Sequence, residues 1–192
     1  AGGVSIIFNS LNNGGCNVVR DTFALSISPS PEAEFIFDSV CNGTPTNFID
    51  QSASVEPIVS WEWDFNGESS STQQNPAYAF NNAGINYTTL IVTSANDCTD
   101  TLTKDITVHF LPEAGFETPA PCLEGGTQYY DTSSVDSASI VSWNWNFGDG
   151  SSSSEQDPLH QYSDAGNYAV GLLVISEYGC RDSISTAVEI YP

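Results

Sequence analysis

Residues Trp143 to Gly150 read WNWNFGDG, and residues Trp61 to Glu68 read WEWDFNGE. In both segments, extended back to Val141 and Val59, apolar and polar residues alternate without a break. That period is typical of a β-strand with one buried face, and aromatic side chains bury about 150 Å² or more each. We therefore predict two equivalent central strands whose Trp side chains all lie in a core.

The similarity between these segments extends over most of the chain. Matching blocks follow one another in the same order at a spacing close to 82 residues. They pair Pro31–Phe35 with Pro112–Phe116, Thr46–Ser52 with Thr127–Ser133, Asn75–Pro76 with Asp157–Pro158, Ala83–Gly84 with Ala165–Gly166, and Asp100 with Asp182. Chance similarity does not keep register through so many blocks, so we predict two repeats, 29–110 and 111–192.

Residues 1–28 resemble the end of a repeat. The segment SIIFNSLNNGGCNVVRDTFALSI parallels LIVTSANDCTDTLTKDITV of the first repeat. We expect residues 1–28 to be the last hairpin of a preceding repeat, in a chain that begins internally or after processing. Cys16 would then have its partner upstream, and the competing interpretation is a free reactive thiol.

Composition restricts the classes of function. The formal net charge is -21 with only three Lys and Arg residues, which opposes binding to nucleic acid and to anionic lipid. Such a surface favours solubility and attracts divalent cations. No run of eighteen apolar residues occurs, so we expect no membrane insertion.

The cysteines follow the repeats, because each repeat has one early and one late cysteine. Cys41 and Cys122 are the early ones, and Cys98 and Cys180 are the late ones. We predict one disulfide per repeat, Cys41–Cys98 and Cys122–Cys180, in an oxidising compartment. Thiolate metal binding is the alternative, but close pairs such as C-x-x-C are missing.

About seven short strands per repeat, a Trp-rich central strand and an early-to-late disulfide predict an all-β fold. The expected architecture is a tandem of antiparallel two-sheet sandwiches. Few Lys, Arg and no Met residues agree with this fold class, because these residues favour helices.

The motif W-x-W-x-F-G-D-G, followed by D-P-L-H-Q-Y, D-A-G-N-Y and a strand ending in Y-G-C, resembles the PKD (polycystic kidney disease) domain. The second repeat matches nearly the whole pattern, whereas the first has WDFNGE in place of the Gly-Asp-Gly turn. The resemblance implies an immunoglobulin-like extracellular module that acts as a spacer or binds protein or polysaccharide, and some members bind calcium.

The segments C-N-G-T-P-T-N-F and N-D-C-T-D-T are similar to PKD repeats of large secreted proteins of Bacteroidetes. These include gliding-motility adhesins and other cargo of type IX secretion. The similarity implies a location outside the cell or at the cell surface.

Three carboxylates around a Ser-rich loop, Asp149, Glu155 and Asp157, form the candidate calcium site, since hard cations prefer several oxygen ligands. The competing interpretation is structural. Gly148 and Gly150 permit positive φ, and Asp149 bonds to nearby backbone amides of a turn.

Catalytic and sugar-binding patterns are weak. The only histidines, His109 and His160, are not at equivalent positions, and neither has a nucleophile or paired carboxylate in the sequence pattern. A sugar site would use Tyr129 or Tyr130, one of which points outward because neighbours in a strand alternate faces.

Asp-Ser or Asp-Thr followed by an apolar residue resembles the O-glycan acceptor motif of Bacteroidetes. The motif gives candidate acceptors at Ser39, Thr101, Ser137 and Ser183. A structural turn is the alternative for the equivalent pair Thr101 and Ser183.

These observations predict a non-enzymatic piece of a larger cell-surface or secreted protein, in which the repeats form a stalk or an adhesive segment. Its expected partners are neighbouring repeats, and surface polysaccharide or another surface protein. No cofactor is required, although calcium could stiffen the junctions. The alternative is a carbohydrate- or protein-binding module attached to a secreted enzyme, which a glycan array distinguishes from a spacer.

Overall fold

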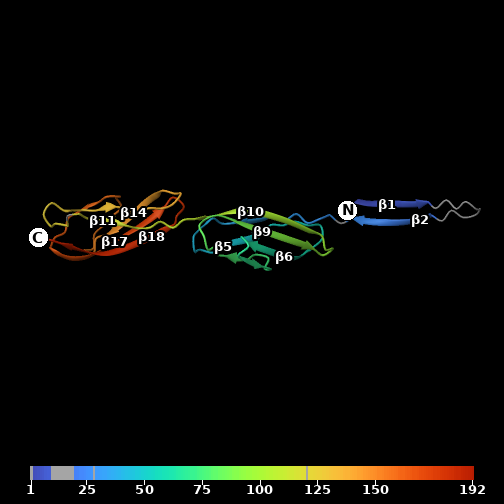
Figure 1. Cartoon of the computed structure of the whole chain (residues 1–192), viewed down its shortest axis with the longest axis horizontal. Coiled ribbons are helices and arrows are strands. Elements are labelled where there is room, and N and C mark those ends of the chain that lie inside the picture. Colours follow the sequence, from blue (N-terminus) through green and yellow to red (C-terminus); the bar gives the residue numbers. More distant parts are fainter. Residues whose placement is uncertain (1, 10–19, 28, 120) are drawn as a thin grey trace, which may run out of the picture. The chain divides into compact units, whose positions relative to one another are not determined.

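A computed structural model describes residues 2–9, 20–27, 29–119 and 121–192. Every regular element in these residues is a β-strand, as expected for an all-β chain (Figure 1). The same residues contain no helix that is long and apolar enough to cross a membrane. The contacts divide the chain into two compact units, Ala1–Asp38 with Asn47–Tyr78 and Tyr87–Asp105, and Ser39–Thr46 with Ala79–Asn86 and Ile106–Pro192.

The first two strands form an antiparallel hairpin. Strand β1 (Gly2–Asn9) pairs with β2 (Arg20–Ile27), from Gly2 opposite Ile27 to Asn9 opposite Arg20. A hairpin is what we expect for the end of a repeat, and its assignment to a preceding repeat stays a prediction. Cys16 lies outside the described residues.

Two sheets hold the strands of the first repeat, in the orders β4-β10-β9-β6-β7 and β3-β5-β8. Pairing is antiparallel for β6 with β7 and β9 and for β3 with β5, whereas β4 is parallel to the end of β10. The strands are β3 (Phe35–Phe37), β4 (Val40–Cys41), β5 (Thr46–Asp50), β6 (Ile58–Phe65), β7 (Ser69–Ser71), β8 (Ala77–Tyr78), β9 (Gly84–Ser94) and β10 (Thr99–His109).

The second repeat has the same plan with shorter outer strands. Its main sheet has the order β15-β14-β17-β18, and β11-β13 and β12-β16 form two small sheets. The strands are β11 (Phe116–Glu117), β12 (Thr127–Gln128), β13 (Tyr130–Asp131), β14 (Ile140–Asn146), β15 (Ser152–Ser153), β16 (Leu159–His160), β17 (Gly166–Ser176) and β18 (Arg181–Ile190).

Aromatic rings fill both cores with the same geometry. Trp63 and Trp145 are 1% and 0% exposed. The ring of Trp63 lies 5.5 Å from Phe48 at an interplanar angle of 49°, and Trp145 lies at the same distance and angle from Tyr129. The duplication read from the sequence therefore extends to the packing of individual side chains.

The alternation that predicted these central strands fails at their first residues. Val59 and Val141 are 58% and 56% exposed, and Trp61 and Trp143 are only partly buried. In both repeats the register shifts at this point, between Ile58 and Ser60 in β6 and at the equivalent place in β14. A β-bulge adds a residue and shifts the alternation before it, which turns Val59 and Val141 outward. Trp61 and Trp143 follow the bulge and are partly buried, and Trp143 packs against the core. The prediction that all four Trp side chains are core is therefore met in full only by Trp63 and Trp145.

Strand β9 differs from β17 at one inward position. The sequence predicts either a bulge or a different inward residue where Tyr87 stands one place later than Tyr168. The structure has the second arrangement, because Asn86 is 3% exposed and Tyr87 is 53% exposed. The Asn86 amide donates to the carbonyls of Asn82 and Gly84, at 3.1 and 3.3 Å, which satisfies the buried polar group.

The turn after β14 requires glycine at one position for two reasons. Gly148 has φ +80°, and a Cβ there would lie 2.7 Å from the carbonyl oxygen of Ala169. Gly150 has φ +95°, but a Cβ there would meet no atom within 4 Å. Close approach to β17 therefore restricts Gly148 beyond its backbone angle.

Replacing Gly148 with Ala should destabilise the second repeat by about 2–4 kcal/mol, because the change combines a strained φ with a backbone clash. Gly150→Ala is the matched control and should cost about 1 kcal/mol, from the backbone angle alone. Urea unfolding followed by Trp fluorescence measures both. Equal losses in the two variants would contradict the close approach to Ala169.

Candidate functional site

The turn at Gly148–Gly150 follows β14, and its Asp149 contacts the side chain of His160 on β16. The His160 Nε2 lies 2.8 Å from the Asp149 Oδ2, and the amide of Ser151 donates to the Asp149 Oδ1 at 2.9 Å. The His160 ring stacks on Phe147 with centroids 4.0 Å apart. Asp149 therefore bonds to a backbone amide of the turn, as the structural interpretation of this segment predicted, and it also orients His160.

The charge of Asp149 is stabilised by these contacts. Partial burial disfavours the carboxylate, but the hydrogen bonds from Ser151 and His160 outweigh it and lower the pKa of Asp149. A group with a lowered pKa stabilises the folded state above its unfolded pKa, and this contribution disappears as the pH falls through the lowered value.

The carboxylates predicted to bind calcium do not form a ligand group. Both oxygens of Asp149 are used as described above, and the Asp157 Oδ1 accepts a hydrogen bond from the amide of Asp131 at 2.8 Å. Glu155 is exposed and contributes its main-chain carbonyl to the indole N–H of Trp145. Across the described residues, no three His, Cys, Asp or Glu side chains are placed to hold a metal ion. The three carboxylates are therefore placed apart, two of them in hydrogen bonds of the fold, and calcium binding at this turn stays a prediction.

Two buried tyrosines form a hydrogen-bonded pair in the second core. The Tyr129 and Tyr162 hydroxyl oxygens lie 2.8 Å apart, and the Tyr162 hydroxyl donates to the carbonyl of Phe147 at 3.1 Å. Burial and the bond to Tyr129 raise the pKa of Tyr162 far above its usual range. Tyr129 is fully buried and Tyr130 is 47% exposed, which confirms that one of this pair faces outward.

A Trp–Asp pair that sequence reasoning missed recurs in both repeats. The indole N–H of Trp61 donates to Asp50, and that of Trp143 to Asp131, each at 2.7 Å. Burial opposes the charge of Asp50, but hydrogen bonds including that from Trp61 prevail and lower its pKa. The signal was present in the sequence, because an Asp and a Trp recur at the same places in both copies.

The disulfide in the structure differs from both predicted pairs. Cys41 is bonded to Cys180, with Cα atoms 5.6 Å apart, and both residues belong to the second compact unit. Cys98 and Cys122 are free thiols. The early cysteine of the first repeat is thus bonded to the late cysteine of the second.

The length of the last strand explains why pairing within a repeat is wrong. Cys41 lies opposite His109 at the end of β10, whereas Cys98 directly precedes Thr99 at its beginning. The eleven residue steps from Cys98 to His109, at roughly 3.4 Å each, separate these two places by about 37 Å. A disulfide needs Cα atoms within about 7 Å.

The second repeat has the same arrangement of cysteines. Cys122 forms a parallel bridge with Tyr191, just beyond the end of β18, and Cys180 directly precedes Arg181 at its beginning. The predicted Cys122–Cys180 bond is therefore excluded by the same separation.

The predicted O-glycan acceptors are accessible. Their side chains lie on the surface in the described part of the chain, at Ser39, Thr101, Ser137 and Ser183. Thr101 and Ser183 follow Asp100 and Asp182, whose carboxylates accept the amides of Ala33 and Ala114 at 2.8 Å. The Asp of this motif therefore has a structural role in both repeats, and glycosylation stays a prediction.

Asp149→Asn should lower the Tm of the second repeat by roughly 2–5 °C at pH 7, because the amide keeps the shape but loses the charge. The difference from wild type should persist above about pH 5 and shrink as the pH falls below about 4, since the lowered pKa then protonates the wild-type carboxylate. Differential scanning calorimetry across pH measures the effect. Glu155→Gln, at an exposed neighbour, is the control and should leave Tm unchanged.

Cys41→Ser, Cys180→Ser and the double variant should lose the same stability, because each removes the same bond. In the chain-entropy model, a loop of 139 residues contributes at most about 5 kcal/mol. Cys98→Ser should change nothing in the oxidised chain. Guanidinium unfolding measures these effects, and a large loss in Cys98→Ser would restore the within-repeat pairing.

Comparisons with known proteins agree with the duplicated sandwich. The family profile described as PKD domain matches residues 28–109 and 111–190. The pre-pro-metalloprotease PrtV of Vibrio cholerae is 35% identical over 89 residues, which is 46% of this chain and 10% of the protease. Collagenase ColQ1 of Bacillus cereus is 31% identical over 97 residues, 45% of this chain and 10% of the collagenase. The chain spans about a tenth of these relatives.

Solved structures that are similar to this chain include two single PKD1 domains. That of Vibrio cholerae PrtV has 33% identity, covers 43% of this chain and 99% of the domain, and gives a TM-score of 0.40. The domain of Vibrio anguillarum Epp has 29% identity, covers 43% of this chain and 96% of the domain, and gives a TM-score of 0.41. The profile match over two consecutive regions identifies the repeats: the chain belongs to the PKD domain family and contains two PKD domains in tandem.

Proposed function

We propose that this chain is a non-enzymatic extracellular segment of a larger protein, in which tandem PKD domains act as a stalk or as part of an adhesive filament. The observation that carries the proposal is the Cys41–Cys180 bond, which covalently links two consecutive domains. A cross-link between domains limits how far the chain can be extended. A disulfide supplies no general acid, general base or nucleophile, so this bond has a structural role.

The polar groups of the second repeat support a structural role. Asp149 and His160 bond to each other, and Tyr129 and Tyr162 bond to each other inside the core. A general acid or base must reach a substrate, but these tyrosine hydroxyls are buried and the Asp149–His160 pair closes a turn. Their chemistry is used for packing.

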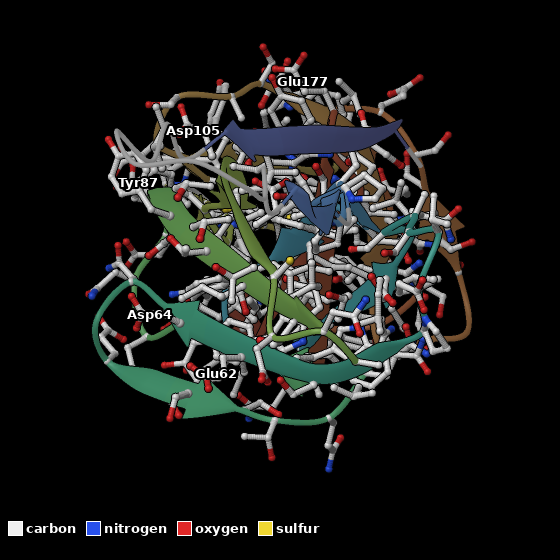
Figure 2. All side chains as sticks on the ribbon, turned by 90° about the vertical axis from the view of Figure 1, so that its right-hand side faces the viewer. Glu62, Asp64, Tyr87, Asp105 and Glu177 are labelled. Carbon is white, nitrogen blue, oxygen red and sulfur yellow. A yellow bond between two sulfur atoms is a disulfide. The ribbon has the colours of Figure 1, made fainter. Side chains whose placement is uncertain are left out.

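The acidic surface fits an extended protein that must stay soluble. Glu62 and Asp64 project from β6 on the side opposite to the buried Trp63, and Asp105 is exposed on β10 (Figure 2). With a formal net charge of -21, such surfaces repel one another and repel polyanions. The proposed partners are therefore neighbouring repeats, and neutral polysaccharide or protein on a surface.

The location and the type of parent protein are part of the same proposal. A disulfide indicates an oxidising compartment, outside the cytosol. The resemblance of the Cys41–Phe48 segment to Bacteroidetes repeats supports a surface adhesin exported by type IX secretion, with a role in gliding motility. Glycans at Ser39, Thr101, Ser137 and Ser183 would suit this setting.

A binding module attached to a secreted enzyme is the second candidate. The related PKD regions occur in proteins named as a metalloprotease and a collagenase. A surface hollow beside the partly exposed Trp143 favours this alternative, since Asp131, Ser133 and Gln156 line it with polar groups. An aromatic ring flanked by hydrogen-bonding groups is a suitable arrangement for a sugar or a peptide.

Stretching the chain from its ends should test the stalk directly. In the oxidised chain, the disulfide shields 139 residue steps from the force, which is about 500 Å of extended chain. Single-molecule force spectroscopy with a reducing agent, or with Cys41→Ser, should release this length. Cys98→Ser is the matched control and should behave as wild type. Equal lengths with and without reducing agent would contradict the proposal.

A glycan and extracellular-matrix protein array should distinguish the two candidates. A spacer should bind no member of the array above the level of an unrelated acidic protein. Specific binding that is lost in Gln156→Ala, but kept in Gln74→Ala at the equivalent place of the first repeat, would instead support a binding module at the Trp143 hollow.

A further inference from the structure

The observed disulfide follows a rule of position. It joins the early cysteine of one domain, Cys41, to the late cysteine of the next domain, Cys180. Among the cysteines that the structure describes, the free thiols are Cys98, the late cysteine of the first domain, and Cys122, the early cysteine of the second. Each free thiol is therefore of the type that would pair with a cysteine of a further domain.

Cys122 occupies the same backbone setting as the bonded Cys41. Cys41 pairs in parallel with His109, and the amide after it donates to the His109 carbonyl at 2.8 Å. Cys122 pairs in parallel with Tyr191, and the amide after it donates to the Tyr191 carbonyl at 2.8 Å. The thiol of Cys122 is thus held at the end of the last strand, as that of Cys41 is, but it is exposed.

Cys98 occupies the same turn position as the bonded Cys180. The carbonyl of Cys98 accepts from the amide of Ser94 at 2.9 Å, and that of Cys180 accepts from Ser176 at 2.8 Å. Cys180 is 1% exposed in the bonded state, whereas Cys98 remains partly accessible.

An aromatic contact accompanies the observed bond. The ring of His109, opposite Cys41, stacks on Tyr178 with centroids 3.9 Å apart, two residues before Cys180. Tyr191 places a ring opposite Cys122 in the position of His109, and it is 51% exposed. The end of the second domain therefore has both the thiol and the ring that the observed linkage uses.

We infer that Cys122 forms a disulfide with the late cysteine of a following PKD domain and Cys98 with the early cysteine of a preceding one, so that every pair of adjacent domains is cross-linked. This inference rests on the proposed function as a row of tandem domains. The partner of Cys122 is a cysteine directly before the last strand of the next domain. The partner of Cys98 is a cysteine beside the end of the last strand of the previous domain.

Exchange with a donor disulfide of a thiol oxidase would form each bond. One cysteine thiolate attacks the donor and releases one donor sulfur as thiolate, and the second cysteine thiolate attacks the mixed disulfide and releases the other. The two cysteines lose two protons and two electrons. The donor disulfide takes up the electrons and becomes a dithiol.

Overlapping loops follow from this pattern. The Cys41–Cys180 bond spans 139 residue steps, and Cys122 lies inside that span. The loop closed by a bond from Cys122 to the next domain would start inside the Cys41–Cys180 loop, so successive disulfide loops would overlap along the sequence. A pulling force transmitted from the preceding domain to Cys98 would pass to the following domain at Cys122. Only the short segment between these two cysteines would then bear the load.

The test is disulfide mapping of the full-length polypeptide by mass spectrometry, after alkylation and digestion without reduction. The Cys122 peptide should be linked to the late cysteine of the following domain, and the Cys98 peptide to the early cysteine of the preceding one. Alkylated Cys98 or Cys122, a bond within one domain, or a bond between two polypeptides would overturn the inference. The glycan array tests the stalk separately, because ligand binding would leave the map unchanged.

A concatenated chain tests the rule without the native protein. Residues 1–192 followed by a second copy of 29–192 keep the spacing of the repeats. Cys98 of the second copy should be protected from alkylation by a bond to Cys122 of the first copy. It should become alkylated when the first-copy Cys122 is replaced by Ser, whereas the matched Cys122→Ser change in the second copy should have no effect. Alkylation of the second-copy Cys98 in the unsubstituted concatemer would contradict the rule.

Discussion

The length of the last strand in each domain is the constraint on which the covalent structure depends. Strands β10 and β18 run from the late cysteine of their domain to the neighbourhood of its early cysteine. Because the two thiols lie at opposite ends of a strand, neither domain can close its own disulfide. The same geometry presents one cysteine at each end of a domain, where it can meet a neighbour. The cysteines therefore contribute to connection between domains, and the aromatic cores must stabilise each domain alone.

The two cores achieve this with the same frame and different polar solutions. Trp63 and Trp145 contact a neighbouring aromatic ring with the same distance and angle. However, Phe48 and Phe80 of the first core are replaced by Tyr129 and Tyr162, which carry hydroxyls, in the second. A buried hydroxyl needs a partner, and the two tyrosines supply one to each other and to a backbone carbonyl. The paired change adds two hydroxyls that bond to each other, so it alters the polarity of the core while the ring geometry around the Trp stays the same.

Much of the fold could be predicted from the sequence, since the alternation at Trp63–Phe65 and Trp145–Phe147 reports a strand directly. It failed at Val59 and Val141, because a bulge depends on pairing with β9 and β17 and leaves no mark in the alternation itself. The carboxylates named as calcium ligands are not gathered into one group in the described residues, for a related reason. Asp149, Glu155 and Asp157 are close in sequence, but His160 and the amide of Asp131, which use two of these carboxylates, come from other strands.

The disulfide pairing illustrates the limit most clearly. Spacing showed that each repeat has an early and a late cysteine, but spacing is the same whether the bond closes within a repeat or between repeats. The distinction depends on the end of the strand at which each thiol lies, which is a property of the folded sheet. An intra-domain bond would make folding depend on oxidation. With a bond between domains, each core can fold while its thiols are reduced, and oxidation afterwards limits the extension of the row and adds up to about 5 kcal/mol of stability. Redox conditions would then control the extension of the row after its domains have folded.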